Sequence, residues 1–123
     1  MNSSPELQLQ SELIKRAQSS CELCLSASEL KPYAVIQHSK LNPDHYLCIC
    51  NTCQSLLEAK PFTASTHWKC LTNQTEKPLI PLQIMLCRIL TKLETQQVEW
   101  AEDLLDQLFF GIDILDLADE QDL

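Results

Sequence analysis

Two C-x-x-C motifs, CELC and CNTC, constrain this chain more than any other feature of its sequence. A gap of two residues lets both thiolates of a pair turn toward one ion, because the intervening backbone forms a tight knuckle. Two pairs supply four sulfurs, which suit a tetrahedral zinc ion and leave no coordination position for water or substrate. The sequence therefore predicts a structural zinc site with the ligands Cys21, Cys24, Cys50 and Cys53.

The chain has seven cysteines, so a disulfide framework and an iron–sulfur cluster have to be weighed against zinc. Seven is an odd number, and the amino terminus lacks the apolar stretch of an export signal, which favours reduced thiols and a cytoplasmic location. The spacing of the two pairs matches neither ferredoxin pattern. Zinc is therefore the expected cofactor. Cys48 and Cys87 have apolar neighbours in the sequence and are expected to be core thiols.

Composition excludes several classes of protein. The chain has one glycine, so it has no glycine-rich loop to bind a phosphate, and dinucleotide-binding and P-loop folds are excluded. Its 123 residues correspond to one ordinary domain, and a hydrophobic content of 45% is typical of a globular chain. No run approaches the roughly 18 apolar residues of a membrane span, so no membrane association is expected.

The formal net charge of −8 is concentrated at one end of the chain. Residues 93–123 hold ten acidic residues and no lysine or arginine, whereas residues 1–92 have a slight basic excess. An acidic end repels phosphate backbones, which disfavours nucleic acid as a partner, but it would attract a protein with a basic groove. The simpler interpretation of such a run is a solvated helix face followed by an acidic tail at residues 119–123.

Residues 1–19 are predicted to form an amino-terminal helix. Ser3 or Ser4 is a suitable cap, Pro5 suits the first turn, and apolar residues then recur up to about Ala17. This helix would lead the chain into the first cysteine pair.

Residues 20–77 are predicted to form a zinc-ribbon-like module. Between the cysteine pairs, prolines and polar turn residues separate two short strands, at residues 33–36 and 46–49, which a hairpin would join. The second pair opens a short helix that Asn51 is suited to cap and that ends before Pro61. A knuckle, a hairpin and a second knuckle that opens a helix form the arrangement of a treble-clef module.

Residues 78–118 are predicted to form a helical hairpin with a short terminal helix. Apolar residues recur at intervals of three and four over residues 82–93 and again over residues 98–109. Gly111 is placed to cap the end of the second helix, and Asp113 to cap the start of the last one. The expected fold class is therefore α+β, mostly α, with a small zinc module packed against a carboxy-terminal helical hairpin.

An ordered series of motifs over residues 21–118 resembles the PhnA-like family, which is named from an association with alkylphosphonate operons. The motifs are CELC followed by SELKPYAV, then LCICNTC, HWKCL and EWAEDLLDQLF. The resemblance implies a zinc-ribbon-like region with zinc on the four paired cysteines, and it carries over no catalytic residue. Leu25 departs from the glycine expected after the first pair. Longer family members continue through an acidic linker into a β-rich domain, which this chain, ending at Leu123, is expected to lack.

His67 and Cys70, in the motif HWKCL, match a further pattern of that family and have two interpretations. They are candidate ligands of a second metal site or substitutes for a ligand of the first. Two ligands without obvious partners seldom make a tight site. The favoured interpretation is therefore a packed Trp68, a hydrogen-bonded His67 and a buried thiol.

Three function classes follow from these observations. The favoured one is a non-catalytic zinc protein in which a structural ion supports a module that binds another protein. A nucleic-acid-binding zinc module is an alternative, although aromatic residues and arginines are scarce. The third is a relative of HNH-type nucleases, in which His38 and His45 would serve metal-dependent hydrolysis.

Overall fold

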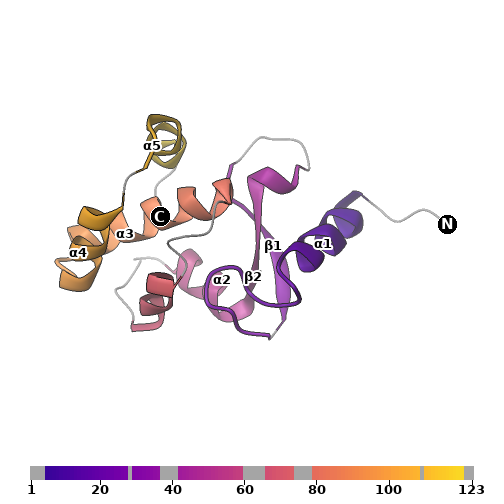
Figure 1. The fold of residues 1–123 in the computed structure, drawn as a ribbon. Coiled ribbons are helices and arrows are strands. Elements are labelled where there is room, and N and C mark those ends of the chain that lie inside the picture. Colours follow the sequence, from indigo (N-terminus) through magenta and orange to yellow (C-terminus); the bar gives the residue numbers. More distant parts are fainter. Residues whose placement is uncertain are drawn as a thin grey trace.

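The computed structural model describes residues 5–27, 29–36, 42–59, 66–73, 79–108 and 110–120. The chain is α+β and mostly α, as predicted, with one two-stranded sheet among the described residues (Figure 1). No helix within these ranges is both long and apolar enough to cross a membrane. The elements follow in the order α1 (Pro5–Arg16), β1 (Leu30–Ala34), the 3-10 helix η1 (Pro43–His45), β2 (Tyr46–Cys50), α2 (Asn51–Glu58), the 3-10 helix η2 (Thr66–Asn73), α3 (Ile80–Thr95), α4 (Glu99–Gln107) and α5 (Ile112–Asp119).

Strands β1 and β2 form an antiparallel hairpin, in register from Leu30 opposite Cys50 to Ala34 opposite Tyr46. The prediction of a strand at residues 46–49 is confirmed, with one residue more. Its partner, predicted at residues 33–36, is present but begins three residues earlier, because β1 starts at Leu30 and continues through Pro32, which was expected to separate the strands. Each strand of a two-stranded sheet is an edge strand, and an edge strand tolerates the missing N–H of a proline.

Strand β2 separates two hydrophobic clusters, because successive side chains of a strand point to opposite faces. Cys48 packs with Leu9 and Leu13 of α1, and its prediction as a core thiol is confirmed. Leu47 and Ile49 belong to the main core on the other face. The hairpin therefore lies between α1 and the helical layer, as Figure 1 shows.

The predicted caps of α1, Ser3 and Ser4, lie outside the described residues.

Helix α3 is the centre of the main core. All its predicted apolar positions are buried, and α4 and α5 both pack against it, so the predicted pair of helices is part of a layer of three. Trp68 and Leu71 of η2 and the knuckle residue Leu23 are also buried in this core. The module that carries the paired cysteines and the helices therefore share one core. Its members from α3 are Leu82, Ile84, Met85, Leu86, Cys87, Ile89, Leu90 and Leu93.

Gly111 does not end α4, so its predicted role as a carboxy-terminal cap is wrong. Helix α4 ends at Gln107, and Gly111 precedes α5 with a φ of −63°, outside the left-handed region that favours glycine. Asp113 is correspondingly inside the first turn of α5 and does not cap it. A carboxylate in a first helical turn still interacts favourably with the helix dipole.

Candidate metal centre

The first cysteine pair forms a knuckle around the sulfur of Cys21. The backbone N–H groups of Leu23 and Cys24 both donate to Cys21 Sγ at 3.4 Å, and the N–H of Leu25 donates to the Cys21 carbonyl at 2.9 Å. Leu25, which stands where a glycine was expected, has a φ of 67°. The knuckle therefore closes with a leucine in the left-handed region.

The second cysteine pair lies where β2 passes into α2. Cys50 caps α2, because its Sγ accepts the backbone N–H of Cys53 at 3.4 Å. Asn51, the predicted cap, is the first residue of the helix, so that prediction is displaced by one residue. The start of a helix stabilises a thiolate, since its free N–H groups and its dipole are positive. Both sulfurs of this pair therefore lie in a favourable place for anionic ligands.

The fold brings the four predicted cysteines together. One sulfur from each lies within 4.8 Å of all the others, and within the described ranges this is the one group of three or more potential metal ligands. The sulfurs of Cys21 and Cys53 are 3.7 Å apart, and those of Cys24 and Cys50 are 3.5 Å apart. In a tetrahedron with zinc–sulfur bonds near 2.3 Å, the sulfurs lie about 3.8 Å apart. The donor set and its spacing therefore fit a zinc-sized ion.

The thiols of this group compete for protons. The pKa of Cys21 is lowered to about 4, mainly because its sulfur shares a hydrogen bond with the Cys53 thiol and also because it accepts nearby backbone N–H groups. The pKa of Cys53 is raised by the same hydrogen bond with Cys21 and by burial of the thiol. Burial is also the main cause that raises the pKa of Cys24 to about 12. A divalent cation would replace the remaining protons and offset the repulsion among four thiolates.

The cluster is closed to solvent on most sides. Cys21, Cys50 and Cys53 are buried, and Cys24 is half-buried. Four thiolates fill a tetrahedral shell, so an ion held here has no open position for a substrate. Such a site crosslinks the chain, in this case joining the first knuckle to the β2–α2 junction.

His67 contacts the cluster from η2. Its Nε2 lies 3.1 Å from Cys53 Sγ, and its ring meets Trp68 edge-on at 5.3 Å between centroids. Trp68 is buried, whereas Cys70 is half-buried, with a pKa raised to about 11 mainly by burial. Neither His67 nor Cys70 belongs to the four-ligand group. The packed Trp68 and the hydrogen-bonded His67 were predicted. The partner of His67, the candidate zinc ligand Cys53, was not predicted.

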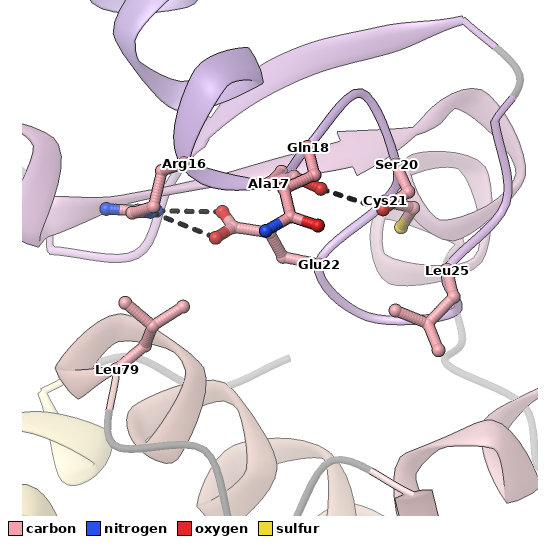
Figure 2. A pocket seen from close by; sticks show the side chains of 8 residues that line it. All are labelled: Arg16, Ala17, Gln18, Ser20, Cys21, Glu22, Leu25 and Leu79. Carbon is pink, nitrogen blue, oxygen red and sulfur yellow. Dashed lines mark hydrogen bonds and ion pairs between the residues drawn. The ribbon is translucent and has the colours of Figure 1, made fainter.

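An ion pair between Arg16 and Glu22, which was not predicted from the sequence, fixes the first knuckle to α1. Glu22 is 5% exposed, and its carboxylate accepts Arg16 Nε and Nη2 at 2.9 and 2.7 Å (Figure 2). The backbone N–H of Cys48 donates to the same carboxylate at 2.7 Å. Arg16 also donates to the carbonyls of Pro43 and Tyr46, both at 2.9 Å. A glutamate between two zinc-ligand candidates was the signal available in the sequence.

The pair borders a cavity of about 400 Å³ between the end of α1, the first knuckle and Leu79. Figure 2 shows Arg16 and Glu22 facing each other on one side of it, with Leu25 of the same knuckle and Leu79, from before α3, at its other sides. Its charged groups are already engaged with each other and with the backbone.

Of the two histidines considered for nuclease chemistry, the structure describes only His45. His38 lies outside the described residues. His45 ends η1, and its carbonyl accepts the N–H groups of Val35 and Ile36 at 2.9 and 3.2 Å. Among described residues, His45 is therefore placed at the hairpin and outside the ligand group.

Comparison of the chain with family models, curated proteins and solved structures finds no match. The resemblance to the PhnA-like family stays a prediction from the motif series.

Proposed function

We propose that this chain is a non-catalytic zinc protein, in which one structural ion stabilises a small module that binds another protein. The observation that carries the proposal is the group of four cysteine sulfurs, all within 4.8 Å of one another. Zinc is the ion that four thiolates in this arrangement suit best. Membership of the PhnA-like family belongs to the proposal and rests on the motifs alone.

The proposed ion would supply much of the stability of the module. Structural zinc contributes a free energy on the order of ten kcal/mol in small zinc peptides, and that energy is linked to folding. Here the ion would join segments that are about thirty residues apart, as in the contact of Cys21 with Cys53. All seven cysteines are free thiols, in keeping with a reducing compartment such as the cytoplasm.

A binding role is favoured over catalysis by the nature of the donor set. A shell of four thiolates has no position for a metal-bound water, which a hydrolytic zinc site requires. The acidic residues from 94 onward favour a basic protein over nucleic acid as the partner. The module would therefore act by presenting a surface.

The first experiment measures metal content and nucleic-acid activity of the purified protein. We expect one zinc per chain, lost in Cys50→Ala and retained in Cys48→Ala, which removes a neighbouring thiol that faces α1. Stoichiometric metal and an unchanged fold in both Cys21→Ala and Cys50→Ala would contradict the zinc assignment. Metal-dependent DNA hydrolysis abolished by His38→Ala would make the protein a nuclease. Tight, salt-sensitive binding of RNA or DNA without hydrolysis would identify a nucleic-acid module.

A further inference from the structure

A groove of about 720 Å³ lies between the start of α3 and one side of α5. Ile114 is buried beneath it, and Leu117 is half-buried at its wall. Ile80 forms part of the opposite wall and is 48% exposed. A Cβ placed on Gly111 would meet no atom within 4 Å, so the groove is open at that end. The lining residues are Ile80, Gln83, Gly111, Asp113, Ile114, Asp116 and Leu117.

The two helices that form this groove carry exposed apolar side chains, of which Ile80 lines the groove and Ile112 and Leu115 lie elsewhere on α5. The described residues expose five large hydrophobic side chains, and three of them are Ile80, Ile112 and Leu115, at the start of α3 and on α5. Two large apolar side chains on one eight-residue surface helix are costly to leave in water. An apolar groove with an exposed side chain such as Ile80 in its wall is typical of a binding surface.

The rim of the groove is acidic. Asp113 and Asp116 line it, and both are exposed. No lysine or arginine occurs in residues 93–123. A nucleic acid or an anionic membrane would be repelled by this rim. A second copy that used the same face would set these carboxylates against each other, because a two-fold interface brings identical patches together.

The dimensions of the groove fit a helix. Its walls come from two helices, and the eight residues of α5 extend over about 12 Å, which is roughly two turns of a helix lying alongside. An amphipathic helix docks in such a groove through apolar side chains spaced three and four residues apart. Lysine or arginine beside those anchors would face Asp113 and Asp116.

We propose that the groove between α3 and α5 binds an amphipathic helix of a partner protein, whose apolar side chains enter the groove and whose lysines or arginines face the acidic rim. This inference rests on the proposed function, because it assigns the surface and the partner chemistry of the protein-binding module.

The test uses the zinc-loaded full chain and a labelled peptide of about 14 residues, long enough for a helix that covers the groove. Its leucines follow the spacing i, i+3, i+4 and i+7, and its other positions are lysine; a comparison peptide has glutamate in place of lysine. Fluorescence anisotropy is measured at about 50 and 200 mM salt, across which screening increases. We expect the lysine peptide to bind, and to bind more weakly at the higher salt. The glutamate peptide is expected to have an affinity at least tenfold lower, because its charges have the same sign as the acidic rim.

Two variants of the groove and one control complete the test. Ile80→Asp is expected to weaken binding about tenfold or more by placing a charge in the wall. The double variant Asp113→Asn, Asp116→Asn is expected to weaken binding at low salt and to reduce its salt dependence. Leu7→Asp makes the same change at an exposed leucine of α1 and should leave binding unchanged. Zinc content and circular dichroism establish that each variant is folded.

Several outcomes would overturn the inference. They are equal affinity for the lysine and glutamate peptides, no binding of the lysine peptide, and binding that Ile80→Asp does not change. A dimer that Ile80→Asp converts to a monomer would identify a second copy as the occupant. If the protein holds one zinc but fails the peptide test, the proposed binding groove is wrong and the zinc assignment stands. If the protein holds no zinc but binds the peptide through Ile80, the zinc assignment is wrong and the groove stands.

Discussion

Arg88, in the middle of α3, donates from Nη1 to the carbonyl oxygen of Val35 at 2.7 Å, and this bond joins the helical layer to the end of the hairpin. The same guanidinium donates to the carbonyls of Leu117 and Ala118 at the end of α5, at 2.8 and 3.1 Å. Arg88 is 7% exposed, and burial lowers its pKa. A cation at the carboxy-terminal end of a helix is favoured by the helix dipole, so α5 supplies part of the stabilisation that this charge needs.

Arg88→Met is expected to lower the free energy of unfolding by about 3 kcal/mol, because three carbonyls lose a charged donor and remain in or near the core. Urea denaturation measures the loss, and hydrogen exchange should show α5 losing protection first. Lys69→Met removes an exposed cation from η2 and is expected to change stability by less than about 0.5 kcal/mol. Equal stabilities of the two variants would show that Arg88 does not hold the layers together.

The features that the sequence predicted are those encoded by local spacing. The four ligands follow from two short gaps, and α3 follows from a repeat of apolar residues along one segment. The start of β1 at Leu30 was not predicted, because it is set by the pairing of Leu30 with Cys50 of the second knuckle. That pairing is a contact between distant segments and not a local pattern of the sequence.

The buried charge of Arg88 was missed for a different reason. Its partners are backbone carbonyls from two distant segments, and a carbonyl leaves no mark in the sequence because every residue has one. One signal was present: Arg88 is the sole charged residue in an apolar stretch from Leu79 to Leu90. A helix that is apolar all round is buried, and a lone charge in it must find partners.

Cys48→Ala is expected to keep one zinc per chain and to lower the free energy of unfolding by about 1 kcal/mol, the cost of a modest truncation in the small core beneath α1. Removing the metal with a chelator should instead unfold the module, since zinc binding and folding are linked. Metal analysis and thermal denaturation test both statements. Loss of zinc in Cys48→Ala would place this thiol among the ligands.

His67→Ala is expected to weaken zinc binding about tenfold, because a partner that orients a ligand contributes roughly that much to metal affinity. Competition with a chromophoric chelator measures the affinity. His67→Gln, which retains a side-chain N–H, should recover part of the loss, and His45→Ala, at the hairpin, should cause none. An unchanged zinc affinity in His67→Ala would show that the contact of His67 with Cys53 contributes to packing and not to metal binding.

Leu25→Gly is expected to raise the free energy of unfolding by about 0.5 to 1 kcal/mol. Leu25 has a φ of 67° and is 50% exposed, so a glycine would remove backbone strain and little packing. Glycine also has greater conformational freedom in the unfolded chain, which offsets part of this stabilisation. Denaturation of the zinc-loaded protein gives the difference. A less stable Leu25→Gly protein would mean that the packing of the leucine side chain stabilises the fold by more than the left-handed backbone conformation destabilises it.

The pair of Arg16 and Glu22 is expected to couple α1 to the first knuckle, which a double-mutant cycle with Arg16→Met and Glu22→Gln measures. Arg16→Met leaves a buried carboxylate that accepts the Cys48 N–H but has lost its cation, so a loss of about 3 kcal/mol is expected. Glu22→Gln removes that charge, and the double variant should be more stable than the sum of the single losses predicts, by about 1 to 2 kcal/mol. Zinc content should stay at one per chain while hydrogen exchange in α1 accelerates, because the pair fixes α1 and does not bind the metal. Additive losses would show that the two side chains act independently despite their contact of 2.7 Å.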